Sequence, residues 1–68
     1  MIPPEVKKTL PTRDLYILTE RFGLNGKKPK TLEAIGKPLN LTRERVRQLQ
    51  NIAIRRVKKA MKEQGYEV

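Results

Sequence analysis

The sequence predicts an all-α fold, a small helical bundle formed as a single domain over residues 1–68. Apolar residues recur at i, i+3 and i+7, the spacing that lines one face of an α-helix. Residues that favour helix starts and stops flank these segments, with threonine or proline before them and glycine or proline after them. No window alternates β-branched or aromatic residues with polar ones, as a half-buried strand would.

The first helix is predicted over residues 11–22. Pro11 suits its first position, because the N–H that proline lacks has no partner there. Gly23 suits the position just past its end. Apolar residues at helical spacing form its inward stripe: Leu15, Leu18 and Phe22.

A short second helix is predicted over residues 32–37. The segment before it is polar, contains the turn pair Asn25-Gly26 and is expected to form a loop. Thr31 is the candidate N-cap. Pro38 is expected to end the helix, since proline fits poorly in a helix interior.

A long C-terminal helix is predicted over residues 43–64. Thr42 is its candidate N-cap and Gly65 is expected to stop it. A short helix, a tight turn and a second helix with a polar face are typical of a helix-turn-helix, whose second helix is the recognition helix.

The composition excludes several classes of protein. Cysteine and histidine are both absent, so the chain has neither disulfides nor the usual thiolate or imidazole metal ligands, and no cofactor is expected. The four carboxylates before the long helix show no spacing that pairs them with a base or a metal ligand, so no enzyme is expected. No apolar run approaches the roughly 18 residues that a membrane span needs.

The charge points to a polyanionic partner. Sixteen Lys and Arg against seven Asp and Glu give a net charge of +9. Residues 42–63 hold eight of these basic residues and only two acidic ones. Candidate partners are therefore nucleic acid, an anionic membrane surface or an acidic protein. A membrane-surface helix would place aromatic residues beside its lysines, whereas aromatics make up 4% of this chain.

The predicted long helix has two faces. One is apolar and is expected to pack on the other helices: Val46, Leu49, Ala53, Ile54, Val57, Ala60 and Met61. The opposite face is polar: Glu44, Arg47, Gln48, Asn51, Arg55, Lys58 and Lys62. Arginine reads guanine, glutamine and asparagine read adenine, and glutamate accepts from the cytosine amino group. The polar face therefore favours nucleic acid.

Simpler roles for single residues stay open. Glu44 can act through the positive helix N-terminus, or pair with Gln48 one turn on. Asp14 is likewise expected near the positive end of its own helix. Arg45 and Arg56 flank the apolar edge of the long helix and are expected to meet phosphates or solvent.

Four runs in fixed order carry a family likeness: Leu-Pro-Thr-Arg-Asp at 10–14, Arg-Phe-Gly-Leu at 21–24, Thr-Leu-Glu-Ala-Ile-Gly at 31–36 and Leu-Thr-Arg-Glu-Arg-Val-Arg-Gln at 41–48. The chain resembles region 4 of bacterial RNA polymerase sigma factors of the housekeeping and stationary-phase type. The likeness covers residues from about 10 to 57. Many members have glutamate at the position of Ala34, and primary members have a basic residue at that of Ile52, used for activator contacts.

The resemblance implies recognition of the promoter −35 element in the major groove, as part of RNA polymerase holoenzyme in the bacterial cytoplasm. The implied base-contacting residues are Arg43, Glu44, Arg47 and Gln48. The implied phosphate-contacting residues are Arg13, Arg21, Leu32 (through its backbone), Thr42 and Arg45.

The resemblance also implies protein partners. The domain would dock on the flap of the polymerase β subunit through an apolar surface, for which the candidates are Phe22, Ile54, Val57 and Met61; core packing is the favoured role for each of these side chains. An anti-sigma factor or an activator is a further possible partner. Two alternatives stay open: a stand-alone helix-turn-helix regulator, and an interaction module for an acidic protein.

Overall fold

A computed structural model describes residues 2–66 and contains four helices within them. These are α1 (Pro4–Lys7), α2 (Thr12–Phe22), α3 (Leu32–Leu39) and α4 (Arg43–Glu63). The described residues contain no strand, which confirms the predicted all-α fold. The predicted domain bounds include residues 1, 67 and 68, which lie outside the described part.

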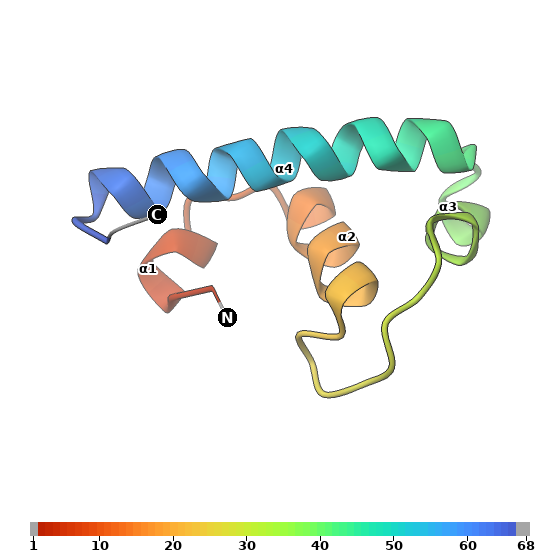
Figure 1. Ribbon diagram of the computed structural model, residues 1–68, viewed down its shortest axis with the longest axis horizontal. Coiled ribbons are helices and arrows are strands. Elements are labelled where there is room, and N and C mark those ends of the chain that lie inside the picture. Colours follow the sequence, from red (N-terminus) through yellow and green to blue (C-terminus); the bar gives the residue numbers. More distant parts are fainter. Residues whose placement is uncertain (1, 67–68) are drawn as a thin grey trace.

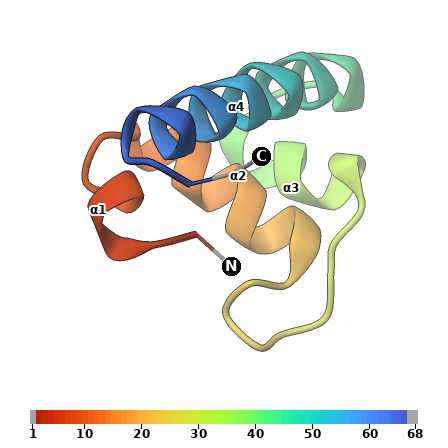
Figure 2. The ribbon, with the colours of Figure 1, turned by 60° about the vertical axis from the view of Figure 1, so that its left-hand side comes forward.

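The long helix α4 forms one side of the molecule, and the three shorter helices pack against it from the other side (Figures 1 and 2). Helix α3 lies under the first turns of α4, α2 under its middle and α1 under its C-terminal half (Figure 1). None of the helices in residues 2–66 has the length and apolar character needed to cross a membrane.

Helix α2 begins one residue later than predicted. Pro11 has φ −58° and ψ 146°, so it is an extended N-cap residue and not the first helical residue. The predicted end is confirmed, since Gly23 adopts the left-handed conformation (φ 66°) and its N–H donates to the carbonyl of Thr19.

Helix α3 extends two residues beyond its predicted end at residue 37 and includes Pro38. The prediction was wrong because proline removes only its own N–H, and the later N–H groups still close the last turn. Those of Asn40 and Leu41 donate to the carbonyls of Lys37 (3.1 Å) and Gly36 (2.9 Å). Asn40, with φ 57°, is the residue that ends the helix.

The turn between α3 and α4 is tight, and α4 is the second helix of the predicted helix-turn-helix. The Thr42 hydroxyl caps α4 by accepting from the Arg45 N–H at 3.1 Å. At Gly36 an added Cβ would lie 2.4 Å from the carbonyl oxygen of Leu41 and 2.9 Å from Cγ2 of Val46. The absence of a side chain at Gly36 therefore allows α3 to approach the turn and α4 closely. Helix α4 ends at Glu63, one residue before the predicted end.

The core consists of two clusters, one on each side of α2. The N-terminal cluster joins α1, α2 and the C-terminal half of α4: Ile2, Val6, Leu18 and Ala53. The helix-turn-helix cluster joins α2, α3 and the first turns of α4: Ile17, Ile35, Val46 and Leu49. The apolar face predicted for the long helix is thus confirmed, with its later members packed against the first cluster.

The inward stripe predicted for α2 was only partly right. Leu18 is buried, but Phe22 is 50% exposed and Ile17, outside the stripe, is fully buried. The reason is that α2 lies between two clusters and contributes adjacent residues, Ile17 and Leu18, to different ones. A single helical stripe describes a helix that packs on one side only.

Candidate nucleic-acid interface

The first two turns of α4 present the four side chains predicted to contact bases. Arg43, Glu44, Arg47 and Gln48 are all exposed. Their direction follows from the opposite face of the same turns, where Val46 and Leu49 are buried against α2 and α3. Because side chains three and four apart share a face of a helix, burial of the apolar pair turns the polar residues toward solvent.

Two of these residues form an ion pair. The Nε of Arg47 donates to both carboxylate oxygens of Glu44 at 3.1 Å, and its Nη2 also contacts Oε1. The hydrogen bond from Arg47 lowers the pKa of Glu44 below its ordinary value, and the same bond raises the pKa of Arg47. The pairing of Glu44 with Gln48 considered from sequence was wrong, because the nearby guanidinium is the stronger partner for a carboxylate. Gln48 instead accepts from Nη1 of Arg45 at 3.3 Å.

A polar hollow of about 350 Å³ lies beside the start of α4. It is lined by residues of three helices and of the loop before α3: Arg21, Thr31, Leu32, Glu33 and Arg43. Leu32 opens α3, where the first N–H groups have no acceptor within the helix. Two guanidinium groups and a helix N-terminus, set against the single carboxylate of Glu33, favour an anion such as phosphate.

Arg21 is held in this hollow by its own loop. Its Nη1 donates to the carbonyl of Lys30 at 2.9 Å, while its buried Nε has no hydrogen-bond partner among residues 2–66. Lys30 in turn pairs with Glu20 at 2.5 Å. This hydrogen bond lowers the pKa of Glu20 and raises that of Lys30. The loop between α2 and α3 is therefore fastened to the last turn of α2.

The other residues predicted to contact phosphate lie outside the hollow. Thr42 and Arg45 are exposed at the start of α4, where the Thr42 oxygen already serves as the helix cap. Arg13 is exposed in the first turn of α2, at the opposite end of that helix from Arg21. The structure thus groups Arg21, Leu32 and Arg43, and it leaves Arg13 apart from them.

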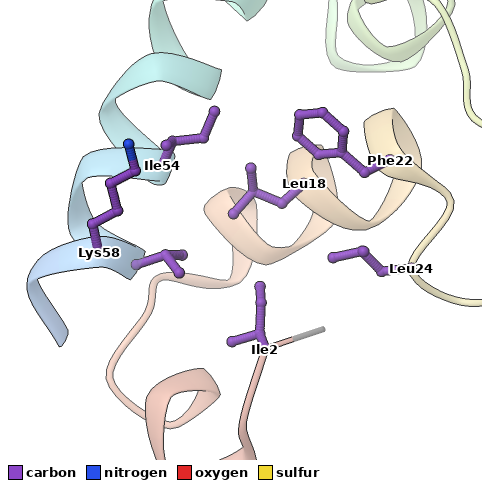
Figure 3. Close-up of a pocket in the computed structure, with 7 residues that line it drawn as sticks. Ile2, Leu18, Phe22, Leu24, Ile54 and Lys58 are labelled. Atoms are coloured by element: carbon purple, nitrogen blue, oxygen red, sulfur yellow. The ribbon is translucent and has the colours of Figure 1, made fainter. Parts of the chain in front are cut away.

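An apolar hollow of about 210 Å³ lies on a different part of the surface, between α2 and the C-terminal half of α4 (Figure 3). Its lining is Ile2, Leu18, Phe22, Leu24, Ile54, Val57 and Lys58. Three of the four residues predicted for polymerase docking are therefore neighbours here. The fourth, Met61, packs against the N-terminal core cluster without lining the hollow, and Ile54 and Val57 also pack against that cluster.

Sequence reasoning missed an ion pair that joins α2 to α4. Nη1 of Arg56 donates to Oδ2 of Asp14 at 2.7 Å, across 42 positions of the chain. Arg56 was expected to meet phosphate or solvent, and this expectation was wrong for its Nη1, because a buried carboxylate lies within reach. Asp14 is 2% exposed. The position of Arg56 at the edge of the apolar face was the one signal in the sequence, since a side chain there can reach the neighbouring helix.

Comparison with known proteins identifies the family. The family model described as "Sigma-70, region 4" matches residues 8–59. RNA polymerase sigma factor SigA of Clostridium acetobutylicum is 41% identical over 54 residues, which are 79% of this chain and 14% of SigA. The chloroplastic RNA polymerase sigma factor sigD of Arabidopsis thaliana is 46% identical over 50 residues, which are 74% of this chain and 12% of sigD.

The matched segment thus spans about an eighth of the length of these curated relatives. No solved structure matches the chain significantly. The family model nevertheless covers α2, α3 and most of α4, and with them the whole helix-turn-helix. The chain belongs to the sigma-70 region 4 family.

Proposed function

We propose that this chain recognises the promoter −35 element in double-stranded DNA, as the region 4 domain of a sigma factor within RNA polymerase holoenzyme. The observation that carries the proposal is the group of four exposed polar side chains on the first turns of α4. The opposite face of the helix is buried against the other helices. These four side chains would therefore point into a DNA groove when the start of α4 enters it. The proposed domain is the whole of residues 1–68.

Each of the four side chains has a matching base edge. Arg43 and Arg47 would donate to guanine O6 and N7, Gln48 would pair with adenine, and Glu44 would accept from the cytosine amino group. The major groove is about 12 Å wide and an α-helix with its side chains about 10–12 Å, so α4 fits it by its N-terminal end. The role is one of binding and not of catalysis.

The phosphate contacts would surround this reading surface. Arg21, Leu32 and Arg43 line the polar hollow, and a phosphate there would meet two guanidinium groups and the α3 N-terminus. Thr42 and Arg45 would contact the backbone at the start of α4, and Arg13 would do so from the first turn of α2. Such contacts position the domain, whereas the base contacts specify the sequence.

The proposed protein partner is the flap of the polymerase β subunit. Phe22, Ile54 and Val57 line an apolar hollow that lies away from the reading surface, so both partners could be bound together. Met61, which packs against the N-terminal core cluster, would support the same surface. Sharing the promoter with other polymerase contacts would raise the effective affinity of a domain that binds weakly alone.

The DNA-reading role is tested by Arg47→Ala, measured by fluorescence anisotropy on duplexes that carry the −35 sequence and every single-base variant of it. We expect about a 5- to 150-fold weaker affinity for the preferred duplex, and relaxed preference at one base pair only. Lys62→Ala removes a positive charge near the far end of α4 and serves as the control. An equal loss on all duplexes would make Arg47 a phosphate contact and refute its reading role.

The polymerase role is tested by retention of the chain on core polymerase. Phe22→Glu puts a charge into the apolar hollow at a half-exposed site and is expected to abolish retention. Gln48→Glu adds the same charge on the reading surface and should leave retention unchanged. If the unaltered chain is not retained at all, a stand-alone regulator becomes the better reading. Binding to an acidic protein together with a flat response of DNA affinity to salt would favour the interaction module.

A further inference from the structure

The ion pair between Glu44 and Arg47 lies inside the proposed reading surface itself. Both side chains are largely in solvent, with exposed fractions of 60% for Glu44 and 50% for Arg47. Neither is held by the core, so the pair can open when DNA arrives. In the free protein, however, the carboxylate and the guanidinium are each other's partners.

The geometry of the pair leaves part of the guanidinium free. Glu44 occupies the edge of Arg47 that carries Nε and one N–H of Nη2. A guanidinium has five N–H donors in a planar fork, so the end formed by Nη1 and the other N–H of Nη2 still points outward. That end is sufficient for a bidentate contact to O6 and N7 of guanine.

The charge of the guanidinium, in contrast, is opposed by that of the carboxylate bonded to it. Three arginines stand in the first two turns of α4, and within residues 2–66 only Arg47 among them has a carboxylate partner. Arg45 is bonded to the neutral amide of Gln48, and Arg43 borders the polar hollow. Arg43 feels the charge of Glu44 at longer range, but within residues 2–66 neither Arg43 nor Arg45 has a carboxylate bonded to its guanidinium.

From this difference we propose that Glu44 is a specificity-determining residue that acts through Arg47. Its carboxylate cancels the charge that would draw Arg47 to any phosphate, and it leaves the donor pair that a base edge recognises. Arg47 then contributes little to the affinity for DNA of random sequence. On the recognised sequence it contributes all of its hydrogen bonds to the base. This inference rests on the proposed function and adds a second role to Glu44 besides accepting from a base.

The experiment compares two duplexes of equal length, one selected by the unaltered chain from a random pool and one with the same bases scrambled. In Glu44→Gln, the freed Arg47 should neutralise one more phosphate on the scrambled duplex. The slope of log affinity against log salt should steepen there by about 0.9, which at 0.15 M salt corresponds to about fivefold tighter binding. The preference for the selected duplex should fall accordingly.

Two control variants separate this mechanism from the loss of a negative charge. Glu63→Gln removes an exposed carboxylate at the far end of α4 that forms no ion pair within residues 2–66, and should leave the slope close to that of the unaltered chain. In an Arg47→Gln background, Glu44→Gln should no longer steepen the slope. Both glutamates are exposed, and circular dichroism checks that each variant is folded.

Failure of the inference differs from failure of the proposed function. If the selected duplex is preferred but Glu44→Gln behaves like Glu63→Gln, or keeps its effect without Arg47, the inference is overturned and DNA recognition stands. If no pool sequence is enriched, or both duplexes are bound equally, the proposed function fails and the inference falls with it.

Discussion

The ion pair between Asp14 and Arg56 should be a main support of the contact between α2 and α4. Arg56→Met keeps a stem of similar length and removes every donor, so it leaves the buried Asp14 carboxylate without its partner. A buried carboxylate that loses its hydrogen bond retains its desolvation penalty without compensation. We therefore expect Arg56→Met to destabilise the domain.

The magnitude follows from how the two partners are exposed. Exposed ion pairs contribute about 0.2–1 kcal/mol, and removal of one partner of a fully buried pair costs about 3–5 kcal/mol. The Asp14 side chain is 2% exposed and that of Arg56 is 51% exposed, which places this pair between the two cases. We expect the free energy of unfolding to fall by about 2 kcal/mol. The total free energy of unfolding is roughly 3–10 kcal/mol for a domain of this size.

The loss is measured by urea unfolding followed by circular dichroism, with an unchanged m value. For a domain of this length it corresponds to a fall in Tm of about 8–16 °C. Arg55→Met makes the same replacement at the exposed neighbouring position and should change stability by no more than about 0.5 kcal/mol. Combined with Asp14→Asn, Arg56→Met should cost much less than it does alone.

Equal effects of Arg56→Met and Arg55→Met would refute this reasoning. That result would mean that water replaces the guanidinium at Asp14 at little cost, so the carboxylate is not effectively buried. Additive effects of Asp14→Asn and Arg56→Met would lead to the same conclusion, because partners in one ion pair must couple.

Three further predictions concern single contacts. Gly36→Ala should cost about 1–3 kcal/mol in urea unfolding, since its Cβ would meet the carbonyl of Leu41 at 2.4 Å; no loss would mean that the turn shifts freely. Thr42→Ala should cost about 1 kcal/mol by losing the cap of α4, and Thr42→Ser should restore it; equal stability of the two variants would contradict the capping role. The Tyr66 hydroxyl donates to Glu5, which lowers the pKa of Glu5 and raises that of Tyr66. The unaltered chain should therefore be more stable than Tyr66→Phe at neutral pH. This difference in stability should disappear as acid protonates Glu5, and also as alkali ionises Tyr66. A difference that stays constant from pH 2 to 12 would contradict this bond.

Local features of the fold were predictable because they depend on residues close in sequence. The caps at Thr31 and Thr42 and the stop at Gly23 each require only a few neighbouring residues, and all three were confirmed. Which face of α4 points to the core and which to solvent was predictable for a similar reason. Its apolar residues repeat on one face for 21 residues, and the opposite face has to meet solvent.

Helix ends and side-chain burial were less predictable where they depend on nonlocal or compensating contacts. Pro38 was expected to end α3, but N–H groups beyond it closed the last turn, and Asn40 ended the helix. Phe22 was expected inside, but α2 is enclosed by two clusters that bury Ile17 and Leu18 and leave Phe22 half exposed.

By itself, then, the sequence determined four things about this protein: an all-α chain, its helix-turn-helix, the polar face of its last helix and its family. Only the tertiary structure decided that Arg21, Leu32 and Arg43 share one hollow, that Phe22 faces Ile54 across another, and that Asp14 binds Arg56. The physical reason is the range of the interactions. Helix formation and amphipathic rotation follow from neighbours within about two turns, whereas these three groupings depend on the angles and distances at which helices separated by loops cross one another.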